Sequence, residues 1–395
     1  MISTKHKSAA IIFPIVFLSL VLTGCQKTQD EVSHESTETV EVYNRDNLPS
    51  ELQELANQGD AEAQISLGWM YLNGESVSQD YFKAAEWYEK AANQGHANAQ
   101  TNLGLMYYQG IGVRQDYAKA MNLYEKAANQ GFSEAQLNLG VMYENGEGVR
   151  QDYAKAMNLY EKAANQGLAT AQYNIGFLYE SGRGVRQDYS KAAEWYEKSA
   201  SQGFSKAEYK MGAMHANGIV LRQDDIKAAE WYKKAANQGL ATAQINLGLM
   251  YANGEGVSQD DIKAAEWYKK AANQGLAQAQ YNVGFIHENG IGVSQDYFKA
   301  AEWYEKAANQ GLVEAQYNIG VMHTNGTGVS QDYAKAKQWF EKAANQGVAQ
   351  AQFNLGVMYA NGTGVRQDDT KAIELFQNAC DKGVQEGCDG SRLLN

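Results

Sequence analysis

The stretch LATAQINLGLMYANGEGVSQDDIKAAEWYKKAANQG, residues 240–275, is the unit from which most of this chain is built. Its glycine Gly248 recurs at intervals of 36 residues, and its last glycine, Gly275, recurs at the same interval from Gly59 to Gly383. Nine units therefore follow one another without insertion or deletion. A fixed period of this length predicts an array of stacked supersecondary units.

The first half of the unit predicts a helix with one apolar stripe. Ala243, Leu247 and Tyr251 are spaced four residues apart, as on one face of an α-helix. Gly254 follows Asn253, where a glycine can take the left-handed conformation that ends a helix. Gly248 lies in mid-helix, where it costs roughly 1 kcal/mol relative to alanine, so its return in every unit predicts a close approach of two helices.

The second half predicts another helix. Asp260 stands where a side-chain oxygen could cap the free amides of its first turn, and Gly275 ends it. Its apolar face, which we expect in the core, comprises Ala264, Ala265, Trp267, Tyr268, Ala271 and Ala272. A helix pair this short cannot bury both faces alone, so each unit depends on its neighbours.

These residues resemble the Sel-one-like repeat (SLR), a relative of the tetratricopeptide repeat. The family pattern is A-x-x-x-L-G-x-x-Y-x-x-G-x-G-V-x-x-D-x-x-K-A-x-x-W-Y-x-K-A-A-x-x-G, and residues 60–383 follow it. Departures are local: Ser76 and Val220 replace a loop glycine, and Cys380 replaces a helix alanine. The resemblance implies an all-α fold, a right-handed α-solenoid of nine 36-residue helix-turn-helix repeats, which binds other proteins as a scaffold or adaptor.

Residues 1–24 are predicted to be a lipoprotein signal peptide. Lys5 and Lys7 precede an apolar run, residues 9–22, that is short for a membrane span. The following Leu22-Thr23-Gly24-Cys25 resembles a bacterial lipobox, which implies that Cys25 is lipidated; the alternative is an ordinary cleaved signal. Gln26 is not the Asp of an inner-membrane retention signal, so this resemblance favours the outer membrane, facing the periplasm or the cell surface.

The remaining segments differ in composition. Residues 25–47 are acidic and poor in large apolar side chains, which predicts a flexible tether. Residues 48–59 match the end of a second helix and predict an N-terminal half-repeat cap, and residues 384–395 predict a partial repeat. The net charge of −12 argues against nucleic acid as a partner, because binding phosphates requires a basic surface.

Two of the three cysteines, Cys380 and Cys388, lie at the C-terminal end. This arrangement resembles that of some secreted SLR proteins, in which every unit has such a cysteine pair bridging consecutive helices. An extracytoplasmic compartment also favours a disulfide. Two free thiols are the alternative. A zinc site is disfavoured because no histidine is nearby.

No set of catalytic residues emerges from the sequence. S-x-x-K, K-T-G and paired histidines at metalloprotease spacing are absent, and no cofactor or metal site is predicted. His215, His287 and His323 share one position in the unit, where the other six units have tyrosine. They indicate either a metal-binding or pH-sensing ladder, or a large side chain with a polar tip on a packed helix face.

A row of asparagines and aromatic residues is the predicted binding surface. Asparagine is a poor mid-helix residue, yet it fills the seventh position of seven units, and in the related tetratricopeptide groove this position faces a bound peptide. The predicted binding residues are Tyr173, Asn174, Tyr209, Asn246, Tyr281, Asn282, Tyr317, Asn318, Phe353 and Asn354. Alternatively, the asparagines tie adjacent first helices together and the aromatic side chains pack between units.

We therefore expect an envelope-anchored scaffold, not an enzyme, that binds a protein or peptide in the concave groove of the solenoid. One alternative is a surface-exposed adhesin or host immune-protein binder. A β-lactam or cell-wall hydrolase is a further alternative, which the missing nucleophile argues against.

Overall fold

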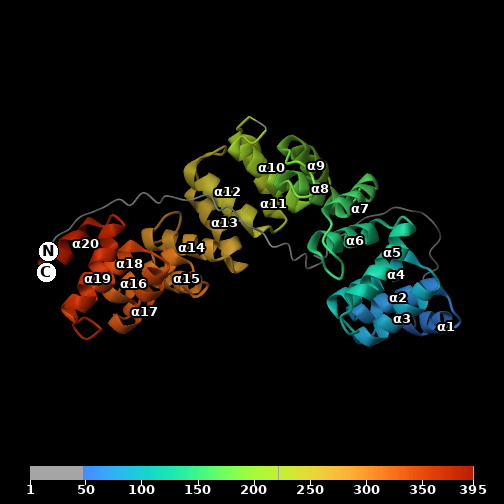
Figure 1. The fold of residues 1–395 in the computed structure, drawn as a ribbon, viewed down its shortest axis with the longest axis horizontal. Helices are drawn as coiled ribbons and strands as arrows, with labels where there is room; N and C mark the ends of the chain where they lie inside the picture. Colours follow the sequence, from blue (N-terminus) through green and yellow to red (C-terminus); the bar gives the residue numbers. More distant parts are fainter. Residues whose placement is uncertain (1–47, 221, 395) are drawn as a thin grey trace. The chain divides into compact units, whose positions relative to one another are not determined.

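The computed structural model describes residues 48–220 and 222–394. These residues contain twenty α-helices and no strand (Figure 1). The predicted cleavage and lipidation site at Cys25 lies outside them, as does the apolar run of residues 9–22. Within the described ranges, no helix is long and apolar enough to span a membrane.

Each repeat consists of a first and a second helix. The first helices are α2 (Ala61–Asn73), α4 (Ala97–Gln109), α6 (Ser133–Asn145), α8 (Ala169–Ser181), α10 (Ser205–Asn217), α12 (Ala241–Asn253), α14 (Ala277–Asn289), α16 (Val313–Asn325) and α18 (Ala349–Asn361). The second helices are α3 (Tyr81–Asn93), α5 (Tyr117–Asn129), α7 (Tyr153–Asn165), α9 (Tyr189–Ser201), α11 (Asp225–Asn237), α13 (Asp261–Asn273), α15 (Tyr297–Asn309), α17 (Tyr333–Asn345) and α19 (Asp369–Asp381). Before and after them lie α1 (Leu48–Asn57) and α20 (Gln385–Leu394).

Packing follows the order of the helices. Every first helix packs on the second helix of its own repeat, and from α4 onward each first helix also packs on the second helix before it. The first helix α4 also contacts α6, the first helix of the next repeat. This neighbour-by-neighbour packing of helix pairs confirms the predicted all-α solenoid.

Alanines and one large ring from each second helix form the core. Tyr268 and Ala264 of α13 are 4% and 2% exposed, which confirms their predicted core positions. Trp267 is half-buried: it packs against the core cluster of α11 and α12, and Lys270 lies over its ring with Nζ 3.9 Å from the ring centroid. The predicted packing of Trp267 in the core thus holds for one face of the ring, and the lysine covers its outer face.

The turns between helices match the sequence pattern. The carboxylate of Asp260 accepts a hydrogen bond from the backbone N–H of Lys263 at 3.0 Å, which confirms the predicted cap. Gly254 ends α12 with φ 73°, in the left-handed region. Ser76 and Val220 take the same region, with φ 59° and 64°, although they have side chains. The two departures from the repeat pattern thus leave the turn intact.

The two outermost helices differ in type. α1 precedes the first helix α2, as a second helix would, whereas α20 follows α19 and packs on it, as a first helix would. Arg392 of α20 stands 36 residues after Gly356, at the position where the nine preceding first helices carry glycine.

Candidate functional site

The structure places the predicted binding residues on one helix type. All ten lie on first helices, from α8 to α18. All ten are half-buried in the middle of the helix, so part of each side chain faces solvent. We call the solvent-facing side of these helices the first-helix face.

The aromatic members of the row pack within their own repeat. Tyr173 contacts Tyr196 of the second helix, with ring centroids 5.4 Å apart, and Tyr281 contacts Tyr304 at the same distance. The other three pairs, at 5.5–5.9 Å, are Tyr209–Tyr232, Tyr317–Phe340 and Phe353–Phe376. Each row ring therefore packs on the buried ring of its own second helix, and the hydroxyls of Tyr209, Tyr281 and Tyr317 also contact an asparagine of the next repeat.

The asparagines of the row reach back to the preceding repeat. Asn246 of α12 makes a polar contact with the hydroxyl groups of Tyr209 and Tyr232. Burial raises the pKa of Tyr209, and the contact with Asn246 opposes this rise. Asn318 contacts Tyr281 and Tyr304 in the same way. These amides thus connect successive repeats, which supports a structural role for them beside any contact with a ligand.

Glutamates near the row were missed by the sequence analysis. The hydroxyl of Tyr160 donates to Glu144 Oε2 at 2.6 Å, and Tyr196 donates to Glu180. Burial raises the pKa of Glu144, and the hydrogen bond from Tyr160 opposes this rise. Glu180 also pairs with Lys210, whose Nζ lies 2.9 Å from the carboxylate and whose position carries asparagine in seven units. The signal was present as a glutamate just before the Asn/Ser-Gly turn, at the end of the first helix.

The three histidines that replace tyrosine lie in separate repeats, on α10, α14 and α16. Each has a buried Nδ1 without a hydrogen-bond partner in the described structure. Burial lowers the pKa of His215 and His287, so it favours the neutral imidazole. Among the described residues, no three His, Cys, Asp or Glu side chains come together as a group that could hold a metal ion.

A second surface carries exposed apolar side chains. Ile226, Ile262 and Phe298 occupy the second position of three successive second helices. They are 63%, 62% and 64% exposed. We call these three residues the apolar edge. Since exposed apolar patches often mark interaction sites, the apolar edge is the main alternative to the first-helix face as a binding surface.

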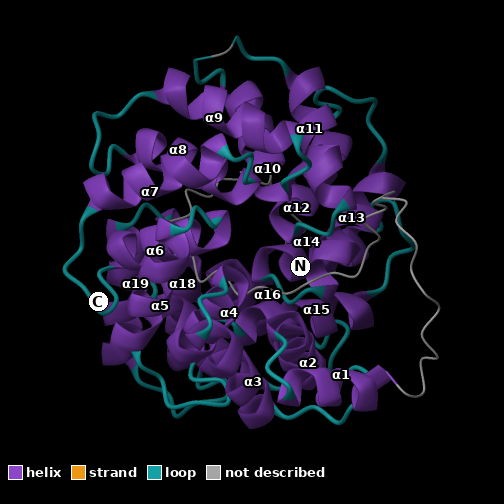
Figure 2. Ribbon diagram, turned by 90° about the vertical axis from the view of Figure 1, so that its right-hand side faces the viewer, coloured by secondary structure: helices purple, strands orange, loops and turns teal. Residues whose placement is uncertain are grey.

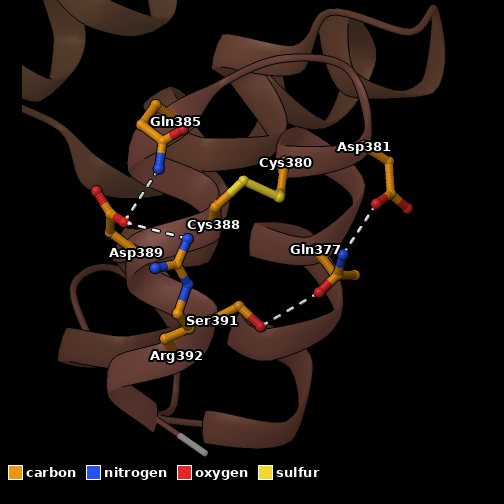
Figure 3. The surroundings of a disulfide bond; sticks show 8 residues. All are labelled: Gln377, Cys380, Asp381, Gln385, Cys388, Asp389, Ser391 and Arg392. Atoms are coloured by element: carbon orange, nitrogen blue, oxygen red, sulfur yellow. Dashed lines mark hydrogen bonds and ion pairs between the residues drawn. A yellow bond between two sulfur atoms is a disulfide. The ribbon is translucent and has the colours of Figure 1, made fainter.

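Cys380 of α19 and Cys388 of α20 form a disulfide (Figure 3). Beside it, Ser391 Oγ of α20 lies 3.4 Å from Gln377 Oε1 of α19. The bond thus joins the last second helix to the helix that covers it. Figure 3 shows no histidine among the surrounding side chains that it labels.

Comparison with known families finds the same repeats in the chain. The Sel1 repeat model matches nine consecutive segments, residues 61–96, 97–132, 133–168, 169–204, 205–240, 241–276, 277–312, 313–348 and 349–384. No match was found among curated proteins.

Two crystal structures are similar over most of the chain. A protective antigen of uropathogenic Escherichia coli with an SLR fold is 38% identical, with a TM-score of 0.73, over 86% of this chain and 73% of the other. A Sel1 repeat protein from Oxalobacter formigenes is 30% identical, with a TM-score of 0.56, over 93% of this chain and 98% of the other.

Proposed function

Since the chain belongs to the Sel1 repeat family, we propose that it is a non-enzymatic scaffold that binds an extended protein segment along its first-helix face. Repeats of this family and the related tetratricopeptide repeats generally mediate protein–protein interactions. The observation that carries the proposal is the row of half-exposed aromatic rings and amides at the sixth and seventh positions of the repeats.

The arrangement of the helices supports this surface. Figure 2 shows the first helices α10, α12 and α14 nearer the middle of the view than the second helices α9, α11 and α13. Inner helices of a solenoid offer a continuous surface to an extended ligand. Half-exposed tyrosines can bury large area there at low cost in side-chain entropy, and the amides can pair with peptide groups.

Site-specific photo-cross-linking tests which surface binds. A photoreactive amino acid is placed at Asn282 on the first-helix face or at Ile262 on the apolar edge, in cells that make the full chain. We expect light-dependent adducts with a partner protein from position 282 and few from position 262. Adducts from position 262 alone would move the binding site to the apolar edge and overturn the proposal.

We further propose that the chain is anchored to the cell envelope through lipid on Cys25. The variant Cys25→Ala tests this anchor. This variant should leave the membrane fraction, and mass spectrometry should find lipid on the mature N-terminus of the unchanged chain. Membrane retention of the variant, together with an unmodified N-terminus in the unchanged chain, would contradict the anchor. The proposed location is the outer membrane, with the repeats facing the periplasm.

A second candidate function is that of a surface-exposed adhesin or host immune-protein binder. It is favoured by one observation, that a 38% identical relative is described as a protective antigen. Protease treatment of intact cells separates the two. Digestion of the repeats without loss of periplasmic marker proteins supports the surface location, and protection supports the periplasmic scaffold.

A further inference from the structure

A buried glutamine closes the junction between successive repeats. In eight repeats the fourth residue of the first helix is glutamine, and its Nε2 donates to a backbone carbonyl eight residues earlier, at the end of the preceding second helix. In α12, Gln244 donates to Ala236 at 3.1 Å and is 4% exposed. The side chain therefore adds a second hydrogen bond to a carbonyl at a helix end, which also accepts from the backbone N–H of Gly239 at 3.0 Å.

A second glutamine extends the junction into the next second helix. Gln274, the C-cap of α13, donates to Gln244 Oε1 at 2.9 Å and to the carbonyl of Gly239 at the same distance. The acceptor side of the buried glutamine and its donor side are both used. Seven of the eight glutamines are part of such a chain of hydrogen bonds, which needs an amide because an amide can donate and accept at once; the exception is Gln352, whose Oε1 has no partner in the described structure.

The fifth repeat breaks this rule, because Glu208 stands where the other repeats have glutamine. Glu208 is 4% exposed and accepts from Gln238 Nε2 at 2.8 Å, so the acceptor side of the junction is kept. An ionised carboxylate has no hydrogen to donate to the carbonyl of Ala200, which lies eight residues earlier. The donor side of this junction is therefore lost whenever Glu208 is ionised.

We infer that Glu208 makes the junction between the fourth and fifth repeats a pH-sensitive joint. When its carboxyl group is protonated, it donates to the Ala200 carbonyl while it accepts from Gln238, as a glutamine does. When it loses the proton, the joint loses that hydrogen bond and holds a buried charge.

The direction of the pH effect follows from the surroundings of Glu208. Burial raises the pKa of Glu208, whereas Lys234 and the hydrogen bond from Gln238, both on α11, lower it. Because burial dominates, the folded state binds the proton more tightly than the unfolded state does. The stability of the joint is therefore complete below the ordinary carboxyl pKa and declines as the pH rises through the raised one.

A weak joint in the middle of a solenoid has a specific effect. The main helix contacts lie within one repeat or between adjacent repeats, so loosening one junction should leave the others in place. At neutral pH the array is expected to open first between α9 and α10, which leaves repeats 1–4 and repeats 5–9 as two blocks. The inference concerns the fold and holds whichever surface binds a partner.

Glu208→Gln tests the joint directly, because the two side chains have nearly the same size and the variant should fold. Hydrogen exchange is measured by mass spectrometry on the whole protein between pH 5 and pH 8. At neutral pH we expect peptides from α9 and α10 to exchange more slowly in the variant, on the order of fivefold for one hydrogen bond. The difference should shrink as the pH falls toward 5.

Gln244→Glu is the matched variant, since it places the same carboxylate at the next junction. Exchange should then become faster at neutral pH around α11 and α12, again less so in acid. Equal exchange in Glu208→Gln and the unchanged protein at all pH values would overturn the inference. So would a Gln244→Glu effect that does not depend on pH.

Discussion

The backbone of Gly248 in α12 lies directly against the ring of Tyr268 in α13. A Cβ atom added at Gly248 would be 2.7 Å from Tyr268 Cε1, closer than atoms in contact can stand. The repeated glycine thus marks where an aromatic ring, and not only a helix backbone, approaches the first helix. Tyr268 is 4% exposed and has little room to move.

Gly248→Ala should therefore destabilise the protein. Overpacking costs about 1–3 kcal/mol, and removing a mid-helix glycine returns roughly 1 kcal/mol. Because the ring is confined, we expect a net loss of about 1–2 kcal/mol in the free energy of unfolding, measured by urea denaturation. In a Tyr268→Leu background the loss should largely disappear; a loss of the same size there would show that the ring is not the cause.

Val220→Gly should stabilise the protein. Val220 has φ 64°, a conformation that costs a side chain about 1–2 kcal/mol, and glycine stands there in most other repeats. Thermal unfolding should show a higher melting temperature for the variant. Gly256→Val is the reverse change in the next repeat, where the added Cβ would meet the carbonyl of Asp225, so it should lower the melting temperature. A lower melting temperature for Val220→Gly would contradict the inference that the backbone at Val220 is strained.

Two asparagines of the row should respond differently to alanine. Asn246 contacts two tyrosine hydroxyls of the preceding repeat, whereas Asn282 accepts a 3.3 Å hydrogen bond from Gln278 on its own helix. Asn246→Ala should lower the melting temperature by several degrees, and Asn282→Ala should change it little. Equal losses of melting temperature in both variants would mean that Asn246 does not stabilise the fold through its contacts with the tyrosine hydroxyls.

Reduction of the disulfide should loosen the end of the array alone. Cys388 and Cys380 stand 36 residues after Gln352 and Ala344, so the covalent bond replaces the glutamine-to-carbonyl hydrogen bond of the other junctions. The chain-entropy estimate for closing so short a loop is about 2.5 kcal/mol. After reduction, hydrogen exchange should rise in α20 and stay unchanged before α17. A non-reducing peptide map that shows two alkylated thiols in protein from the envelope would contradict the bond.

The fold could be predicted because each repeat carries strong local signals. The 36-residue interval, the cap at Asp260 and the turn at Gly254 act within a few residues of chain, and the structure has them as expected. Whether the asparagines of the row serve the fold or a ligand was harder to predict. Asn246 serves the fold through tyrosines of another helix pair, and sequence spacing alone does not show which side of a helix meets them.

The glutamine junction was not predicted at all. Gln244 looks like an ordinary helix-forming residue, and only packing shows that it is 4% exposed and bonded at both ends of its amide. Glu208 is a conservative change in sequence terms. Its effect appears only when the amide of Gln238 is seen to donate to it, and when the other junctions show that a side chain at this position donates to the carbonyl eight residues earlier.

Arg392 affects whether a further helix can pack on α20 as a second helix packs on a first helix. In the repeats, the second helix places its large ring against the first-helix glycine, and α20 has an arginine at that position. A helix of the second type would therefore meet the side chain of Arg392, and not a glycine, at this position of α20. Because head-to-tail contacts of this kind do not close, they would produce filaments. We therefore expect the arginine side chain to disfavour filaments that extend the repeat geometry from one molecule to the next.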